Sequence, residues 1–206
     1  MIIASAAHFE IEPLYAEFCQ NPSISFFSFG IGCLEAARRE SDFLSIAKDK
    51  EVWVVGTCGS WKPFSGVELL TTHRILWLPL CERVGLAESI EGIDPPIVIT
   101  PTSAVSSLAS YTLVCGPTIA SSSEIVPHVR NKYELDEITL AENIEFYVFA
   151  KNLIRVAKKV NFLLAITNQV GPDGRRQWRE NFREAADKSA QFIRSKLVFE
   201  YPTEKT

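Results

Sequence analysis

The chain has 206 residues, of which 47% are hydrophobic and 22% are charged, enough apolar material for one buried core. We therefore expect a single domain that spans residues 1–206. The formal net charge of −4 and an isoelectric point near 5.5 argue against nucleic acid or a membrane surface as the main partner, since the field of the chain attracts neither. A small molecule or another subunit is the expected partner.

The cysteines and histidines show no metal-binding pattern. No two cysteines form a C-x-x-C pair and the histidines are scattered, so we predict no metal and no cofactor. The apolar residues 1–7 have no basic segment before them and are too short for an export signal. No run approaches the roughly 20 apolar residues that span a bilayer. We therefore expect a cytoplasmic protein with reduced cysteines. The residues concerned are Cys19, Cys33, Cys58, Cys81, Cys115, His8, His73 and His128.

Apolar runs alternate with amphipathic ones, which predicts an α/β fold: three αβα layers around a central, largely parallel mixed sheet. Residues 82–110 are expected to form loops around one strand, and the polar tail at 201–206 to fray. In chain order, we expect strands at Ile2–Ala6, Glu51–Val55, Val67–Trp77, Ile97–Thr100, Thr112–Cys115, Glu137–Leu140 and Phe162–Ile166, and helices at Pro13–Cys19, Leu34–Ala47, Glu142–Lys159 and Arg175–Leu197.

The most informative segment is Ala165–Pro172. The apolar run Phe162–Thr167 has the length of a strand and stops at an amide, Asn168, before Gly171 and the following proline break the chain. Ligands of α/β sheets collect at the carboxyl ends of strands. The pattern therefore predicts that this strand delivers Asn168 into a site.

Two acidic residues also follow expected strands. Glu10 stands between the first strand and a helix that begins near Pro13, although an isolated Glu is more often solvated, as we expect for Glu12. Glu145 lies near the start of the helix expected at Glu142–Lys159, where interaction with the helix dipole alone would explain an acidic residue. Both positions admit a functional and a structural interpretation.

Glycines interrupt the chain after two strand-like runs. Gly30-Ile31-Gly32 precedes the helix expected at Leu34, so its backbone amides are candidates for binding an anion, with a tight turn as the alternative. Gly56-Thr57-Cys58-Gly59-Ser60 ends another strand with small residues that allow a ligand to approach the backbone. Neither motif is specific by itself.

Taken in order, these motifs resemble the purine nucleoside phosphorylase and nucleosidase superfamily, and the resemblance extends over almost the whole chain. Within the superfamily, Phe9–Ile11, Cys58–Trp61 and the run from Ile166 to Trp178 are most similar to futalosine hydrolases, which release hypoxanthine from futalosine on a route to menaquinone. The motifs are Ala7–Ile11, Phe29–Gly32, Gly56–Ser60, Glu142–Glu145 and Ala165–Asn168.

The resemblance implies a phosphorylase-like fold and a role for each matching residue. Glu10 falls where hydrolytic members orient and deprotonate water, and Asn168 falls where the leaving base is held. Glu145 falls where the ribose hydroxyls are bound, with Ile144 against the sugar. Further substrate-binding positions are Gly32, Thr57, Cys58, Gly59 and, in place of an aromatic residue that often stacks on the base, Ile119.

Asn168 bears on the choice of base. Adenine-releasing nucleosidases have Asp at this position, which protonates the base, whereas an amide offers one acceptor and one pair of donors and fits a 6-oxopurine such as hypoxanthine. The first loop, residues 6–11, holds no arginine for phosphate, and His73 with Arg74 supplies at most one arm of a phosphate clamp. Water is therefore the expected nucleophile.

Alternatives remain. A methylthioadenosine or adenosylhomocysteine nucleosidase, a nucleoside phosphorylase and a nucleoside-binding protein without catalysis share the fold. Leu78–Gly85 departs from the acidic turn usual in the futalosine type, which leaves the substrate tail open. The resemblance also implies a homodimer or larger homo-oligomer. For a substrate carrying a benzoate, the candidate contacts are Arg74, Arg175, Arg176 and Trp178.

Overall fold

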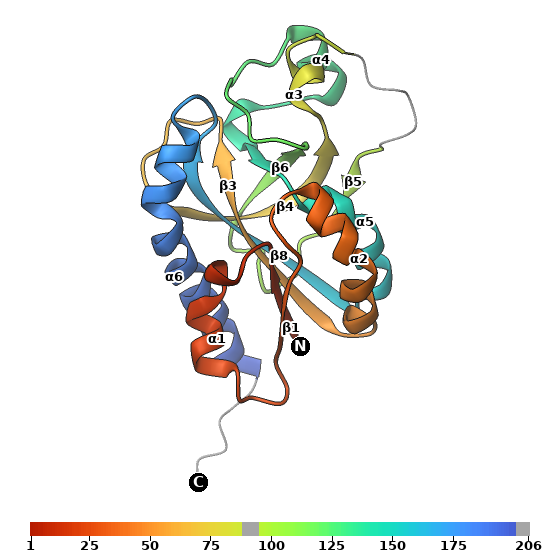
Figure 1. Cartoon of the computed structure of the whole chain (residues 1–206), viewed down its shortest axis with the longest axis vertical. Coiled ribbons are helices and arrows are strands. Elements are labelled where there is room, and N and C mark those ends of the chain that lie inside the picture. Colours follow the sequence, from red (N-terminus) through yellow and green to blue (C-terminus); the bar gives the residue numbers. More distant parts are fainter. Residues whose placement is uncertain (88–94, 201–206) are drawn as a thin grey trace.

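The computed structural model describes residues 1–87 and 95–200, and within them eight strands form one mixed sheet (Figure 1). Five strand pairs are parallel and three are antiparallel, so the largely parallel sheet expected from the sequence is confirmed. The strands are β1 (Ile2–Ser5), β2 (Ser25–Ser28), β3 (Glu51–Ser60), β4 (Glu68–Trp77), β5 (Ile97–Val98), β6 (Ala109–Cys115), β7 (Leu140–Asn143) and β8 (Lys159–Gln169).

The strand order closes part of the sheet on itself. Neighbours follow the order β2-β1-β3-β7-β6-β4-β5, and β8 pairs with both β3 and β4. Strands β3, β7, β6, β4 and β8 therefore form a closed ring, with β1 and β2 attached along β3 and β5 attached to β4.

Helices cover both faces of the sheet (Figure 1). Helices α1 (Glu12–Phe18) and α6 (Gly174–Glu200) pack together on one side, and α2 (Cys33–Ala47) and α5 (Phe146–Val156) on the other. These layers confirm the αβα architecture. The shorter helices are η1 (His8–Glu10), α3 (Leu80–Arg83), α4 (Pro127–Tyr133) and η2 (Glu137–Thr139). Among the described residues, we find no helix whose length and hydrophobicity together would let it span a bilayer.

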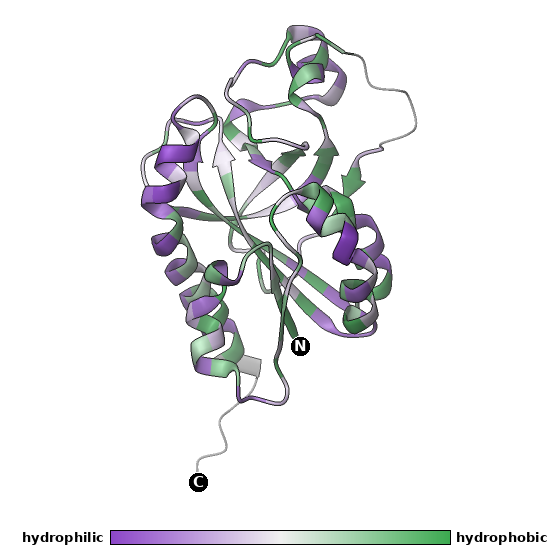
Figure 2. Ribbon diagram, viewed as in Figure 1, coloured by the Kyte–Doolittle hydropathy of each residue, from purple (hydrophilic) through white to green (hydrophobic). Residues whose placement is uncertain are grey.

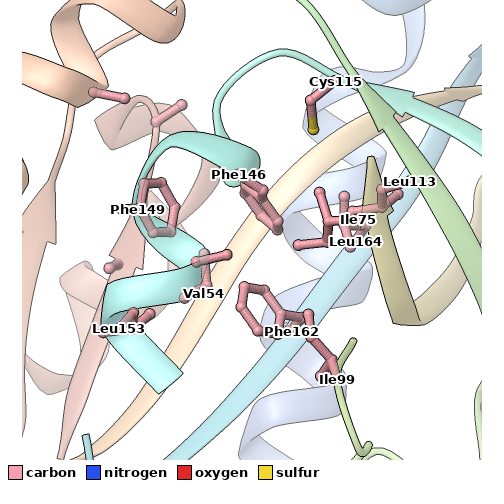
Figure 3. Close-up of a cluster of buried hydrophobic side chains, with 14 of the residues drawn as sticks. Val54, Ile75, Ile99, Leu113, Cys115, Phe146, Phe149, Leu153, Phe162 and Leu164 are labelled. Atoms are coloured by element: carbon pink, nitrogen blue, oxygen red, sulfur yellow. The ribbon is translucent and has the colours of Figure 1, made fainter. Parts of the chain in front are cut away.

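The alternation of side chains along β3 explains the two cores. Val52 and Val54 belong to the cluster that includes residues of α2 and α5, whereas Trp53 and Val55 belong to the cluster that includes residues of α1 and α6. Figure 3 shows the first cluster, where Phe146 of α5 lies against the sheet. In Figure 2 the hydrophobic colour follows the strands, whereas much of α6 is hydrophilic. Both faces of β3 are therefore buried.

One expected strand and the start of one expected helix are wrong. Residues 137–139 form the short helix η2, and the strand follows it at Leu140–Asn143. Helix α5 consequently begins at Phe146 rather than at Glu142, and it ends at Val156, before Lys159 opens β8. The error arose because acidic residues such as Glu142 and Glu145 are typical of the first turn of a helix.

Other elements were missed or were longer than expected. The short elements β2, α3 and α4 were not predicted, and β3 and β8 extend several residues beyond their apolar runs, to Ser60 and Gln169. Within the described part of residues 82–110, β5 at Ile97–Val98 is shorter than the strand expected at Ile97–Thr100. Strand β6 begins at Ala109, three residues before the expected Thr112, so this range holds more than the one strand expected. The predicted fraying of residues 201–206 lies outside the described residues.

Candidate functional site

A cavity of about 310 Å³ opens where β1, β3 and β8 end, a size at the low end of the range for small-molecule sites. Eight of the nine predicted site residues line it; Gly32 does not. The lining residues are Ala6, Ala7, Phe9, Glu10, Ile31, Thr57, Cys58, Gly59, Ile119, Glu142, Asn143, Ile144, Glu145, Thr167, Asn168, Gly174, Arg175 and Trp178.

Glu10 lies in η1, between β1 and α1, and its side chain is buried. Its Oε2 accepts a hydrogen bond from the Ala7 amide at 3.0 Å, and its Oε1 accepts from the Thr57 amide at 3.1 Å and from the Thr57 hydroxyl at 3.3 Å. Burial, and then the charge of Glu145, raise the pKa of Glu10 to about 7 against the lowering effect of these bonds. A carboxyl group with this pKa exchanges a proton near neutral pH.

The backbone of Thr57 forms hydrogen bonds with side chains, at a point on β3 where neither β1 nor β7 pairs with it. Pairing with β1 ends at Val55 and pairing with β7 begins at Gly59, and between them the Thr57 amide bonds Glu10. The Thr57 carbonyl accepts from Asn143 Nδ2 at 3.2 Å. The gap in strand pairing thus leaves the backbone of β3 open to the cavity residues.

Asn143 is a cavity residue to which the sequence analysis assigned no role. Its Oδ1 accepts from the amides of Glu145, at 3.0 Å, and Phe146, at 2.9 Å, at the start of α5. With Nδ2 bonded to Thr57, this one side chain fixes the start of α5 to the end of β3. The asparagine between two acidic residues was visible in the sequence, but its capping role depended on where the helix begins.

Glu145 is buried and reaches across to the start of α2. Its Oε1 accepts from the Gly32 amide at 2.8 Å, and burial raises its pKa above the ordinary value. The amide that the sequence marked as a candidate for anion binding therefore binds a carboxylate of the chain itself, at the N-cap of α2. Gly32 holds Glu145 and does not line the cavity.

Asn168 is directed into the cavity by an irregularity in β8. The register between β3 and β8 shifts at this level, so that Cys58 pairs with Ile166 and Gly59 with Asn168, which leaves Thr167 as the extra residue of a bulge. Asn168 Oδ1 accepts from the Thr167 hydroxyl at 3.0 Å, and Nδ2 donates to the Gln169 carbonyl at 3.1 Å. An amide has two N–H groups, so one donor remains.

Gly59 leaves the space that Asn168 occupies. A Cβ atom at Gly59 would lie 2.7 Å from Asn168 Nδ2 and 3.1 Å from Val170 Cγ2. We expect Gly59→Ala to displace the Asn168 amide and to lower the free energy of unfolding by about 1–3 kcal/mol, as overpacking does. Denaturant unfolding measures this change, and an unchanged stability would contradict the assigned packing.

Trp178, on α6, closes one side of the cavity. Its Nε1 donates to the Thr57 hydroxyl at 3.1 Å, and its ring packs edge to face on Phe9 with 5.8 Å between centroids. The indole N–H occupies an acceptor position on the hydroxyl, which leaves the hydroxyl proton to be donated to Glu10. Trp178, Thr57 and Glu10 therefore form one hydrogen-bonded chain.

Of the basic residues proposed from the sequence to contact phosphate or an acidic substrate tail, one lines the cavity and the others lie outside it. Arg175 lines the cavity, whereas Arg176 bonds Glu180 on the exposed face of α6. Arg74 donates to the Tyr133 carbonyl, and His73 bonds Ser110, both outside the cavity lining. Within the described ranges, no three side chains of the metal-ligating types gather into a group.

Comparison with known proteins relates the fold to nucleosidases. The sequence matches no protein-family model and no curated protein sequence. Among solved structures, it is similar to the 5′-methylthioadenosine/S-adenosylhomocysteine nucleosidase of Helicobacter pylori, with a TM-score of 0.72, 17% identity and 97% of each chain covered.

Two further solved structures have a similar fold. Futalosine hydrolase of H. pylori gives a TM-score of 0.69 at 16% identity, with 97% of each chain covered. The nucleosidase of Colwellia psychrerythraea, solved with adenine, gives 0.66 at 15% identity over 93% of this chain and 91% of that one. This chain therefore has the fold of these nucleosidase structures, in agreement with the α/β fold expected from the sequence.

Proposed function

We propose that this protein is a nucleoside N-glycosidase that hydrolyses the bond between base and ribose in a 6-oxopurine nucleoside, of which futalosine is the leading candidate. The observation that carries the proposal is a buried Glu10, with a pKa of about 7, in the same cavity as Glu145 and Asn168. Cleavage of an N-glycosidic bond needs a base for water, groups that bind the sugar and a donor to the departing base. The cavity holds one residue suited to each of these.

In the proposed reaction, the ionised Glu10 takes a proton from a water molecule as the oxygen of that water attacks the anomeric carbon. Its bonds from Ala7 and Thr57 leave the carboxylate in one fixed orientation. The glycosidic electron pair moves onto the base, where the remaining N–H of Asn168 stabilises the developing negative charge. Glu145 accepts hydrogen bonds from the ribose hydroxyls, oriented by the Gly32 amide.

Water is preferred to phosphate as the nucleophile because the cavity carries little positive charge. Among the residues that the structure describes, Arg175 is the one arginine or lysine in its lining. A phosphate dianion is usually held by several charge-assisted bonds, which a single guanidinium does not supply. The same residue is the candidate for contacting an acidic group on the tail of the nucleoside, ahead of Arg74 and Arg176.

A second candidate is hydrolysis of methylthioadenosine or adenosylhomocysteine. The observation that favours it is the likeness to nucleosidases named for those substrates. Asn168 argues against it, since an amide cannot protonate adenine. A nucleoside-binding protein without catalysis is the alternative of a different class.

The test is release of free base by the purified protein, measured by chromatography with futalosine, inosine or methylthioadenosine, with and without phosphate. We expect hypoxanthine from futalosine at equal rates in both buffers. Release that requires phosphate would indicate a phosphorylase, and adenine release from methylthioadenosine alone would indicate the second candidate. Binding without release would indicate a nucleoside-binding protein.

Trp178→Phe tests the hydrogen-bonded chain to Glu10. Phenylalanine keeps a ring beside Phe9 but removes the indole N–H, so the Thr57 hydroxyl is no longer oriented toward Glu10. We expect the acidic limb of kcat/KM to move up by as much as about one pH unit, the value of one hydrogen bond. In the control Trp53→Phe, the lost N–H has no partner among the described residues and the limb should stay unchanged.

Three further features belong to this proposal. We propose that residues 1–206 act as one domain and that the protein is cytoplasmic, which is supported by five free cysteines. We also propose a homodimer or larger homo-oligomer, supported by Ile31 and Ile119, which line the cavity and are 61% and 52% exposed. Sedimentation equilibrium measures the mass, and a monomer would contradict the last point.

A further inference from the structure

The part of β8 that carries Asn168 extends past the last pairing of this strand with β4. The two strands pair from Leu70 and Leu164 to Glu68 and Ile166, and β4 begins at Glu68. Among the described residues, no other strand replaces β4 on that edge of β8 beyond Ile166. Because buried backbone N–H and C=O groups need partners, the residues around Asn168 depend there on bonds from outside the sheet.

Side chains of α6 supply such bonds. Asn181 Nδ2 donates to the Thr167 carbonyl at 3.0 Å, and Gln177 Oε1 accepts from the Gln169 amide at 2.8 Å. These two backbone groups belong to the residues on either side of Asn168. Gln177 and Asn181 therefore hold the backbone of β8 immediately before and after the side chain that lines the cavity.

The first turns of α6 are built for this contact. Gln177 and Asn181 are four positions apart and so lie on the same face of the helix, and Asn181 Nδ2 also donates to the Gln177 carbonyl at 2.7 Å. Helix α6 begins at Gly174, where a Cβ atom would lie 3.0 Å from Asn168 Nδ2 and 3.1 Å from the Gln169 carbonyl oxygen. Glycine at this position thus lets α6 approach β8 closely.

The orientation of the Asn168 amide depends on the same two neighbours. Its Oδ1 accepts from the Thr167 hydroxyl at 3.0 Å, and its Nδ2 donates to the Gln169 carbonyl at 3.1 Å. Because both partners are adjacent in sequence, a change in the backbone at Thr167 or Gln169 moves a group that the amide bonds. The bonds from α6 therefore restrict the direction in which the remaining N–H of Asn168 points.

We propose that Gln177 and Asn181 are positioning residues that act through the backbone of β8 to orient the Asn168 amide toward the substrate. This inference rests on the proposed function and deepens it, because it assigns the orientation of a substrate-binding group to α6. Neither side chain belongs to the cavity lining, so neither is expected to contact the substrate. Misplacing a catalytic group by about 1 Å can lower the rate about 100-fold, so the loss of one of these bonds should be measurable in kcat.

The first test is a pair of substitutions at Gln177. Gln177→Met keeps the length of the side chain but removes the acceptor for the Gln169 amide, whereas Gln177→Glu keeps an acceptor. We expect kcat for base release from futalosine to fall about 10- to 100-fold in Gln177→Met and to stay within about threefold of the parent value in Gln177→Glu. The matched control Gln191→Met alters an exposed residue of the same helix and should leave kcat unchanged. An unchanged kcat in Gln177→Met would overturn the inference.

A double-mutant cycle separates positioning from a general effect on the fold. Gln177→Met, and Asn181→Leu, which removes the donor to the Thr167 carbonyl, should each lower kcat/KM about tenfold or more in the parent protein. In a protein that already carries Asn168→Ala, each should lower it by less than about twofold. Equal losses in both backgrounds would overturn the positioning role. If Asn168→Ala shows no turnover, the measurements that follow decide.

The next test does not depend on hydrolysis. Hydrogen exchange of the Gln169 amide and the ¹H–¹⁵N NOE of the Asn168 side-chain NH₂, identified by its loss in Asn168→Asp, report the contacts in solution. We expect Gln177→Met to accelerate the exchange at least about tenfold and to lower the NOE, and Gln177→Glu to restore both. An unprotected Gln169 amide in the unaltered protein would overturn the inference even if a variant does not fold.

The two proposals fail in different ways. A protein that releases no base from any nucleoside, but shows the expected changes in exchange and NOE, would contradict the proposed function and support the positioning of Asn168 by α6. A protein that hydrolyses futalosine, and whose Asn168 amide is equally ordered in the parent and in Gln177→Met, would do the reverse.

Discussion

Replacing Glu10 with glutamine is expected to lower kcat for nucleoside hydrolysis by about 10²- to 10⁴-fold, because an amide cannot take a proton from water. The glutamine oxygen still accepts one of the bonds from Ala7 and Thr57, so the cavity keeps its shape. KM should change little. Steady-state kinetics with futalosine or inosine measure both constants, and an unchanged kcat would exclude Glu10 as the base.

The same side chain sets two pH dependences. Because the carboxyl group acts in its ionised form and has a pKa of about 7, kcat/KM should fall tenfold per pH unit below that value. The folded-state pKa lies above the reference value of 4.5, so the unfolded chain loses its proton first, and stability falls as the pH rises from 4.5 to about 7. The loss is on the order of 3 kcal/mol.

The Glu10→Gln variant should therefore show the reduced kcat but lack this loss of stability. Urea unfolding of both proteins at pH 4.5 and pH 8 measures the difference. Glu12→Gln is the matched control, since Glu12 is exposed and two residues away, and it should change neither activity nor the pH dependence of stability. Equal pH dependence in the parent protein and Glu10→Gln would show that burial of Glu10 does not destabilise the fold.

Asn168→Asp is expected to reduce cleavage of 6-oxopurine nucleosides by about 10²-fold or more, the usual cost of removing a donor to a developing anion. At neutral pH the introduced carboxylate faces acceptor atoms of the base in place of the Nδ2 donor. The preference for 6-oxo over 6-amino substrates should fall, because an aspartic acid can protonate adenine. The ratio of kcat/KM for inosine to that for methylthioadenosine measures it.

The surface substitution Asn131→Asp adds the same charge away from the cavity and serves as the control for a general effect of charge. Its substrate ratio should equal that of the parent protein. An unchanged ratio in Asn168→Asp as well would contradict the assignment of Asn168 to the base.

The sequence allowed the prediction of polar residues at the ends of apolar runs. Glu10 and Asn168 follow apolar runs that have the length of a strand, and the carboxyl ends of such strands meet at one edge of a sheet. Glu145 was predicted to belong to the same site because of the resemblance to the superfamily. The three residues line one cavity because the strands that carry or precede them end at the same edge of the sheet.

Residues whose roles depend on long-range pairing could not be predicted. Glu142 was predicted to begin a helix because acidic residues are common there. Its ion pair with Arg83, 59 residues away, cannot be recognised from the neighbouring sequence. Gly32 was predicted to bind the substrate. Only the folded structure shows that its amide donates a hydrogen bond to Glu145, which lies 113 residues later in the sequence. The bulge at Thr167 is equally invisible, as it depends on the register with β3.

The closed ring of strands also determines when the cavity can form during synthesis. Among the described residues, β8 is the last strand, and it closes the ring because it pairs with both β3 and β4. A nascent chain that ends before Lys159 can pair its earlier strands but cannot close the ring, and it lacks Asn168. Such late, non-local pairing slows folding. The cavity is therefore completed only after the residues of β8, through Asn168, have been made.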